Sequence, residues 1–327
     1  MKRLLAILQL MRVALALTAV ADAWTLLLMN LPGRTVPTDL IVRLTMAGLE
    51  AFFLYSFGMT LNDLLDARRD RLFASWRPIP SGKISPPAAI ILSIVFLMLS
   101  LFFAAMLDVT RGQLYLPGSL LIAFSAAMFI VFYNSAGKFL GSIGLVSLGM
   151  IRALNSTIGR PDAHFLLLCM FLFTHITLAG TLAYHLESKR PRLKNIDIVI
   201  ILANLLVVNG LMLSAMIFWK QVNRALLIDA AGPALMLVIF YIWAVMQASS
   251  VSLPTRQRGE RIMLVGLFWL FCIDAAMLLS NGQFAQAGFI AILGIVSLIT
   301  FFLMRLLGRG VPVRRPSYRL LETKSAS

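Results

Sequence analysis

Long apolar segments separated by short polar connections run along nearly the whole chain. We identify ten candidate spans, at residues 5–28, 40–62, 87–107, 115–133, 139–158, 164–186, 197–219, 226–247, 262–280 and 285–305. Each approaches the roughly 20 apolar residues that a helix needs to cross a hydrocarbon core about 30 Å thick. This pattern predicts an all-α fold, a polytopic membrane bundle of nine to ten transmembrane helices around a central cavity.

The composition supports this prediction and excludes a soluble globular domain. Hydrophobic residues make up 60% of the 327 residues and charged residues only 13%, and the mean hydropathy is +0.88. Soluble domains carry roughly 25% charged residues. Both cysteines, Cys169 and Cys272, fall within predicted spans, so no disulfide framework is expected. We expect one membrane domain over residues 1–306 and a basic, disordered tail over 307–327.

The net charge of +15 is distributed unevenly along the chain. Most lysines and arginines fall on connections that share a side with the N-terminus, including those at 63–86 and 184–196. The positive-inside rule explains this asymmetry without nucleic acid as a partner. We therefore expect an integral protein of a bacterial inner membrane with both termini in the cytoplasm, where anionic membrane lipids attract the basic tail.

The sequence NDLLDARRDRLFASWRPIPSGKIS, residues 62–85, gathers carboxylates at the end of the second span. Asn62, Asp66 and Asp70 recur every four residues, so on a helix they form one polar stripe. Asp63 is turned to an adjacent face, where we expect substitution to be tolerated better than at Asp66. Such a stripe suits Mg²⁺ ions that take one or two carboxylates each and complete their shells with water and substrate phosphates.

Basic side chains follow the stripe. Arg77 and Lys83 offer charge-assisted contacts to the same phosphates. Ser85 is a predicted N-cap, with Pro86 entering the next span. The alternative interpretation is a solvated helix end, whose aspartates pair with the adjacent arginines Arg68, Arg69 and Arg71.

The stretch resembles the first signature of the UbiA superfamily of intramembrane prenyltransferases. That signature is N-x-x-x-D-x-x-x-D, followed by an arginine and an RP-x-P-S-G-x-I loop, which here runs from Arg77 to Ile84. The segment YNSAGKFLGSIGLVSLGMIRALNSTIG, residues 133–159, is similar to one found in an EboC-like branch. The order of the spans agrees through the first seven, whereas a tenth span departs from the nine usual in the superfamily.

The resemblance implies a Mg²⁺-dependent prenyltransferase, which moves a polyprenyl group from its diphosphate donor to a lipophilic acceptor. It implies catalytic roles for Asn62, Asp66, Asp70 and Arg77, and metal ligation by the first three. The substrate-binding residues that we expect are Lys83, Tyr133, Asn134, Lys138, Arg152, Asn155, Tyr184, Glu187 and Lys189. The loops at 63–86 and 184–196 should then approach each other over one cavity mouth.

The second aspartate motif of the superfamily is absent. In the connection after the sixth span, Glu187 is the only carboxylate before Asp197. Such a site either holds one Mg²⁺, with Lys189 or Arg190 replacing the charge of a second ion, or binds a phosphate lipid without turnover. A carrier of isoprenoid phosphates and a secondary transporter are therefore the alternatives. Transporters place their polar sites near the bilayer midplane, whereas the polar residues here gather at one rim, which disfavours the transporter.

Ionisable residues within the spans are costly in lipid and are expected to face the bundle interior. Asp22 and Arg152 fall at similar depth, in the first and fifth spans. We predict that they form a buried ion pair or share Asn155 as a partner. The alternative is that they belong to the substrate cavity.

Overall fold

The computed structural model describes residues 2–29, 39–112, 118–160, 166–187, 191–218 and 224–308. Over these residues the regular structure is entirely helical, in agreement with the predicted all-α class. The helices are α1 (Lys2–Met11), α2 (Val13–Leu28), α3 (Leu40–Leu65), α4 (Ala67–Phe73), α5 (Pro86–Thr110), α6 (Gly118–Ser135), the 3₁₀ turn η1 (Gly137–Phe139), α7 (Ser142–Thr157), α8 (Leu167–Leu186), α9 (Asn195–Phe218), α10 (Arg224–Ser249), α11 (Thr255–Ser280) and α12 (Phe284–Gly308).

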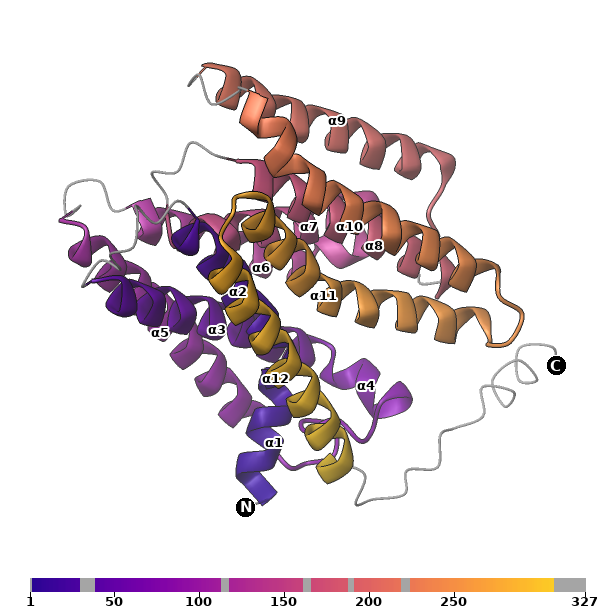
Figure 1. Ribbon diagram of the computed structural model, residues 1–327. Helices are drawn as coiled ribbons and strands as arrows, with labels where there is room; N and C mark the ends of the chain where they lie inside the picture. The colour runs from indigo at the N-terminus through magenta and orange to yellow at the C-terminus, as the bar shows by residue number, and fades with distance from the viewer. Residues whose placement is uncertain are drawn as a thin grey trace.

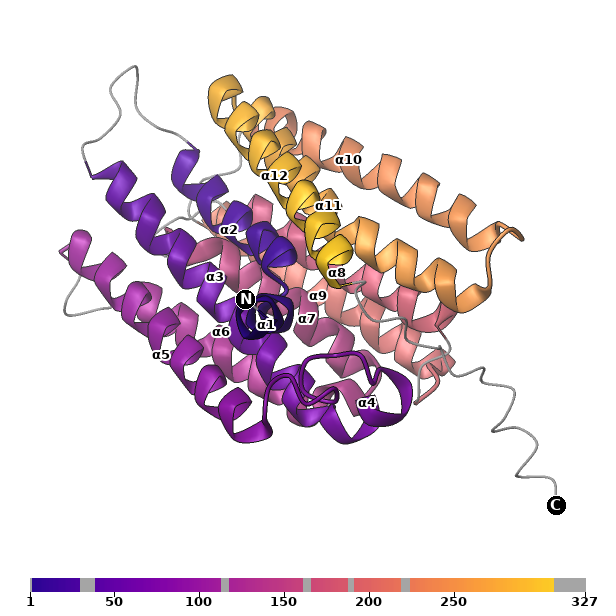
Figure 2. The same cartoon turned by 90° about the horizontal axis from the view of Figure 1, so that it is seen from below.

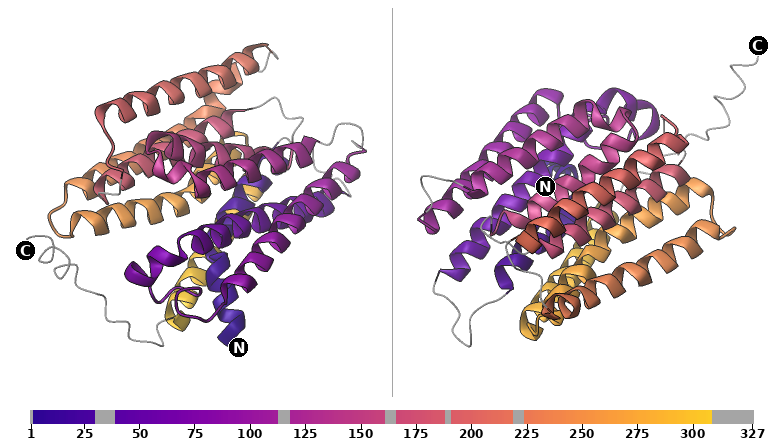
Figure 3. Two further views of the ribbon diagram at one scale, coloured as in Figure 1. Left: turned by 180° about the vertical axis from the view of Figure 1, so that it is seen from behind. Right: turned by 90° about the horizontal axis from the view of Figure 1, so that it is seen from above.

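The helices form two groups that meet at α2 and α7. In one group α3 packs against α5 and α6, and in the other α11 packs against α8 and α10 (Figures 1 and 2). α2 contacts α3, α7 and α11, while α7 also contacts α6 and α8. α9 packs on the outside of α7 and α8 and is nearest the viewer in the right panel of Figure 3. The first predicted motif, at the end of α3, therefore faces the junction of the two groups.

By length and composition, eight of the described helices could cross a membrane, and the bent pair formed by α1 and α2 could provide a ninth span. This number lies within the predicted range of nine to ten. The segment expected to span at 139–158 gives only the 16 residues of α7, which extend about 24 Å at 1.5 Å per residue. It is shortened because Gly141, with a φ of 55°, separates η1 from α7.

The first predicted span, at 5–28, is broken at Arg12. α1 and α2 are inclined by 44° to each other, and Arg12 between them has φ 50° and ψ 48°. Among the described residues it is the only one other than glycine with a positive φ. Residues other than glycine rarely adopt this left-handed backbone conformation. Contacts elsewhere in the fold must therefore hold the bend in place.

α12 lies across α2 and α11 in Figure 1 and packs against both. The rings of Trp24 and Phe289 stack with their centroids 5.3 Å apart, which joins α2 to α12. The helix continues to Gly308, two residues beyond the expected domain end at residue 306. The predicted disordered tail falls, from residue 309 onward, outside the described residues.

Close packing around α7 depends on glycine. A Cβ atom added at Gly149 would lie 2.2 Å from Thr177 Oγ1, and one added at Gly144 would lie 2.3 Å from the carbonyl oxygen of Gly137. Atoms cannot approach so closely, so no other residue fits without a shift of α7. Small residues of this kind allow membrane helices to pack at short distance.

Candidate active site

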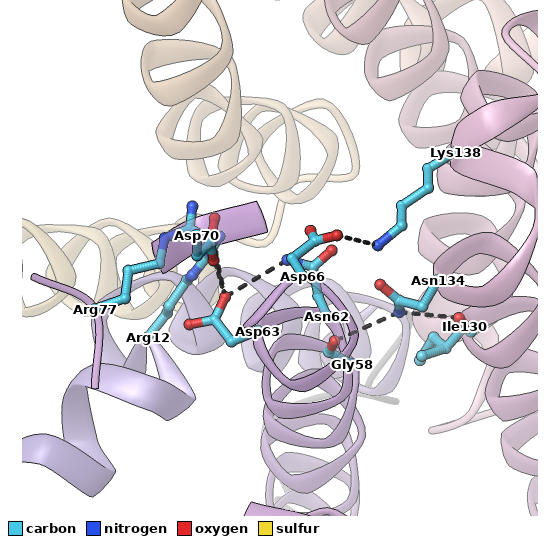
Figure 4. A network of polar contacts seen from close by, with 10 residues as sticks. All are labelled: Arg12, Gly58, Asn62, Asp63, Asp66, Asp70, Arg77, Ile130, Asn134 and Lys138. Carbon is cyan, nitrogen blue, oxygen red and sulfur yellow. Dashed lines mark hydrogen bonds and ion pairs between the residues drawn. The ribbon is translucent and has the colours of Figure 1, made fainter. Parts of the chain in front are cut away.

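The predicted carboxylate stripe spans the junction of α3 with α4. The backbone N–H of Asp66 donates to the carbonyl of Asn62, and that of Asp70 donates to the carbonyl of Asp66, so the four-residue helical spacing is kept. The side chains nevertheless diverge. Figure 4 shows Asp66 directed toward Lys138 and Asp70 directed toward Arg77. The stripe is therefore divided into two ion-paired halves.

Lys138 neutralises Asp66, the middle residue of the stripe. Its Nζ atom lies 2.6 Å from Asp66 Oδ1, and the two side chains are 13% and 19% exposed. Lys138 belongs to η1, so this pair holds the turn after α6 against the end of α3. Water screens a pair of this burial less than it screens a surface salt bridge, which makes the attraction stronger.

Arg77 neutralises the last carboxylate of the stripe. Its Nη1 atom lies 2.6 Å from Asp70 Oδ2 and 3.3 Å from Asp63 Oδ1. Burial raises the pKa of Asp70 above its ordinary value, while the adjacent guanidinium of Arg77 acts in the opposite direction. The loop that carries Arg77 is ordered by backbone bonds such as that from Ser81 N to the carbonyl of Arg77. It ends at Ser85, which caps α5 as predicted.

Asp63 is more closely involved than its position on an adjacent face had led us to expect. It is 3% exposed, and its Oδ1 atom accepts a hydrogen bond of 3.1 Å from Arg12 Nη2 in addition to the contact with Arg77. These contacts favour sensitivity to substitution at Asp63, so its better tolerance relative to Asp66 stays a prediction that they argue against. The adjacent arginines of the alternative interpretation are exposed and form no ion pair with these aspartates in the described part of the chain; they are Arg68, Arg69 and Arg71.

The predicted asparagines support the backbone around the carboxylates. Asn62 Nδ2 donates to Asp63 Oδ1 over 3.5 Å, and Asn134 Nδ2 donates over 3.5 Å to the carbonyl of Gly58 on α3. Asn134 Oδ1 is buried and has no hydrogen-bond partner among the described residues, so it remains available to a ligand or a water molecule. Lys83 is exposed in the loop between α4 and α5.

Tyr133, Tyr184 and Glu187 lie around the same end of the bundle. Tyr133 on α6 interacts electrostatically with Asp66 and with Glu187. Tyr184 on α8 interacts with Arg69 on α4. The end of α8 therefore lies near the ends of α3 and α4, whereas residues 188–190 of the predicted loop lie outside the described residues.

The remaining contacts of the α8 end are structural. Tyr184 Oη donates to the carbonyl of Pro191 over 2.7 Å. Glu187 is the C-cap of α8 and packs against Gly259 of α11. The contact is close, since a Cβ atom added at Gly259 would lie 2.8 Å from Glu187 Cγ. Lys189, the last of the predicted substrate-binding residues, lies outside the described residues.

Arg152 and Asn155 lie on α7 and join it to α2. Arg152 forms the predicted ion pair with Asp22 and donates to Thr18 Oγ1 over 2.6 Å. Asn155 does not share this pair, since its Nδ2 atom donates over 2.8 Å to the carbonyl of Ala19. Among the described residues, no hydrogen bond or ion pair links Arg152 or Asn155 to the aspartates of α3 and α4.

Asp274 on α11 is a third member of the cluster formed by Asp22 and Arg152. Asp22 and Asp274 interact electrostatically with each other and with Arg152, and both residues are fully buried. Tyr55 on α3 interacts electrostatically with Arg152 and with Asp63. This tyrosine therefore lies between the buried cluster and the carboxylates at the end of α3.

Sequence reasoning missed Arg12, Asp63 and Asp274 as members of these clusters. The sequence does mark Arg12 and Asp274 as charges within apolar spans, and such residues require a partner. Their partners could not be read from the sequence, since Arg12 contacts a residue 51 positions further along the chain. Asp63 gave no signal beyond its place next to Asn62.

Its apolar helices make this chain an integral, multi-pass membrane protein, with a charged cluster at one end of the bundle. The sequence profile of the UbiA prenyltransferase family matches residues 14–272, which is most of the chain. The chain belongs to the UbiA prenyltransferase family, as its resemblance to the superfamily led us to expect. α12 lies beyond the matched residues.

One solved structure supports the fold, and a second is reported for comparison. A structure of digeranylgeranylglyceryl phosphate synthase has 19% sequence identity and a TM-score of 0.59, and the alignment covers 86% of this chain and 99% of that one. A structure of a UbiA homolog from Archaeoglobus fulgidus bound to GPP and Mg²⁺ has 17% identity and a TM-score of 0.47, over 89% of this chain and 99% of the other. No curated protein sequence matches the chain significantly.

Asp66 and Asp70 fit Mg²⁺ by the chemistry of their side chains. Mg²⁺ typically takes one or two carboxylates and fills its other positions with water and substrate phosphates. No group of three or more His, Cys, Asp or Glu side chains in the described part of the chain is arranged to hold a metal ion. The donor set therefore suits an ion that arrives with a diphosphate, whose charge would draw Lys138 and Arg77 away from their carboxylates.

Proposed function

We propose that this protein is an intramembrane prenyltransferase that moves a polyprenyl group from its diphosphate to a lipophilic acceptor and requires Mg²⁺. The observation that carries the proposal is the cluster at the junction of α3 and α4. There, three carboxylates are each within 3.3 Å of a basic side chain. A diphosphate can exchange places with Asp66 and Asp70 as the partner of Lys138 and Arg77, which leaves these two carboxylates free for a metal ion.

The residues divide into two sets by charge. Asp66 and Asp70, with Asn62, would hold Mg²⁺, which when bound stabilises negative charge on the departing diphosphate. Arg77, Lys138, Arg12 and Lys83 bind the phosphate oxygens through charge-assisted hydrogen bonds. Arg77, Lys138 and Arg12 lie near the carboxylates before the donor arrives, so little reorganisation is needed when charge develops.

The remaining predicted residues fit the approach of the donor and acceptor. Tyr133, Tyr184 and Glu187 border the carboxylate end, where the acceptor would meet the allylic carbon of the donor. Apolar helices behind this end would hold the isoprenoid chain and exclude water from the allylic cation. Glu187 is the single carboxylate that the loop after α8 contributes, so we propose one metal ion rather than two.

The orientation proposed for the protein puts this cluster at the cytoplasmic face of a bacterial inner membrane, with both termini on the same side. The uneven distribution of lysine and arginine supports this orientation. A prenyl diphosphate is an anion with a long apolar tail, so it would reach the cluster from the cytoplasmic leaflet without moving its charge into the bilayer core.

A carrier of isoprenoid phosphates is the second candidate function. It is favoured by the absence of the second aspartate motif, because a site with fewer carboxylates can bind a phosphate without stabilising its departure. The two candidates differ in whether a carbon–oxygen bond is broken.

Lipid analysis of cells with and without the gene tests the proposal. If the protein is a prenyltransferase, mass spectrometry of the lipid extract should show at least one species that loses the mass of a prenyl group on deletion. Complementation by the wild-type gene should restore it, and complementation by Asp66→Asn should not. An unchanged lipid profile would contradict the enzyme and favour the carrier.

A further inference from the structure

Asp63 links two arginines that come from different parts of the chain. Its Oδ1 atom accepts from Arg12 Nη2 at 3.1 Å, from Arg77 Nη1 at 3.3 Å and from Asn62 Nδ2 at 3.5 Å. Figure 4 shows both arginines on one side of α3 and Lys138 on the other, with Asp63 between them. A single carboxylate oxygen therefore fixes the positions of two guanidinium groups.

Asp63 differs from the two arginines in burial, because its side chain is enclosed whereas theirs are partly exposed. The Asp63 side chain is 4% exposed, whereas those of Arg12 and Arg77 are 33% and 32% exposed. Each arginine has five N–H donors in a rigid fork, and Asp63 engages only part of each. The unengaged donors therefore belong to the accessible surface of the cluster, while Asp63 lies beneath it.

The backbone at Arg12 indicates that this arrangement is maintained against a conformational preference. Arg12 has a left-handed conformation at the bend between α1 and α2, which residues other than glycine seldom adopt. The bend directs the Arg12 side chain to Asp63. α1 also packs on the loop that carries Arg77, through Ile79 and Ile84. The two arginine-bearing segments are thus joined by apolar packing as well as by Asp63.

We propose that Asp63 is a positioning residue, which holds the Arg12 and Arg77 side chains next to each other so that both bind the diphosphate of the donor. The proposal rests on the proposed prenyl diphosphate site. Asp63 itself contacts neither the metal ion nor phosphate, because its Oδ1 atom already accepts three N–H groups and a carboxylate would repel the phosphates. Its effect reaches the ligand only through the two guanidinium groups.

Titration calorimetry with inorganic diphosphate tests this role on the full-length protein in nanodiscs, with Mg²⁺ and with EDTA. Asp63→Asn should weaken binding roughly tenfold, the loss typical when an outer-shell partner is removed. The loss should be the same in both buffers, since the arginines bind phosphate without metal. Glu260→Gln, which removes the carboxylate of an exposed pair with Arg256, is the control and should bind like wild type.

A double-mutant cycle shows whether Asp63 acts through the arginines. In a background of Arg12→Gln and Arg77→Gln, Asp63→Asn should cause no further loss of affinity. An equal loss in that background would overturn the proposal, and so would a loss seen only with Mg²⁺, which would make Asp63 a metal ligand. Wild-type affinity of Asp63→Asn would overturn it as well.

The proposal can fail independently of the proposed function. If wild type transfers prenyl groups while Asp63→Asn binds diphosphate normally, the function stands and the positioning role falls. If no transfer occurs but the cycle behaves as expected, the positioning role stands in a binding protein. Should Asp63→Asn not fold, Arg12→Lys tests the contact between Arg12 and Asp63. Lysine keeps the positive charge but lacks the forked N–H donors of the guanidinium group. It should weaken diphosphate binding several-fold, and unchanged binding would contradict the proposal.

Discussion

Arg152 carries one positive charge in the interior of the bundle and faces two carboxylates, those of Asp22 and Asp274. Asp22, on α2, is its direct ion-pair partner. Asp274, on α11, interacts with Asp22 and with the same guanidinium. All three residues are buried, Arg152 being 6% exposed and both aspartates 0%. Replacing one of these carboxyl groups by an amide therefore leaves the arginine with the other carboxyl group nearby.

The expected stabilities follow from this redundancy. Asp22→Asn removes a charged contact but leaves Asp274, so it should cost roughly 2 kcal/mol of unfolding free energy, the value of a hydrogen bond to a charged group. Asp274→Asn leaves the direct pair between Asp22 and Arg152 intact, so its effect should be small. The double variant strands a buried guanidinium and should cost roughly 3–5 kcal/mol. The coupling energy between the two sites should then be at least about 1 kcal/mol.

Equilibrium unfolding in mixed detergent micelles, followed by circular dichroism, measures these energies. Glu50→Gln is a matched control, because Glu50 is a fully buried carboxylate whose described partner is the hydroxyl of Ser100 rather than a cation. It should leave the unfolding free energy nearly unchanged. Strictly additive costs for Asp22→Asn and Asp274→Asn would refute the reasoning. They would mean that Asp274 does not replace Asp22 as the partner of Arg152.

Three further outcomes are expected. Asp66→Asn should weaken donor binding and flatten its Mg²⁺ dependence, measured by titration with a prenyl diphosphate at several Mg²⁺ concentrations; a retained Mg²⁺ response would exclude Asp66 as a ligand. Glu187→Gln should lower prenyl transfer less than Asp66→Asn does, and a larger loss would mean that the loop after α8 contributes the principal carboxylate. Gly149→Ala should cost roughly 1–3 kcal/mol through overpacking against Thr177, in the same unfolding assay. Its control, Gly210→Ala, has open space around it and should be neutral or stabilise by about 1 kcal/mol; equal costs at the two glycines would contradict the packing argument.

Much of the fold could be predicted because membrane helices are recognisable from local sequence alone. The spans expected at 40–62, 87–107 and 164–186 match α3, α5 and α8 to within a few residues. The bend at Arg12 could not be predicted, because neither glycine nor proline marks it. Its left-handed backbone is compensated by a contact with Asp63, and contacts of this kind are decided by tertiary structure.

The composition of the candidate site could be predicted in part. Helical spacing identified Asp66 and Asp70, and the loop after them identified Arg77. Spacing could not show that the two carboxylates point to different partners. One of those partners, Lys138, comes from a distant segment, 72 residues from Asp66. Periodicity records which face a residue occupies on its own helix, but it does not record which segment packs against that face.

The central claim is that the cluster at the end of α3 breaks the bond between a prenyl group and its diphosphate. The most direct measurement is the release of diphosphate from labelled geranylgeranyl diphosphate by membranes that contain the protein. The account predicts release that requires Mg²⁺, stops with EDTA and is lost in Asp66→Asn. Binding of the labelled donor without release, at any Mg²⁺ concentration and with the native membrane lipids present as acceptors, would contradict it.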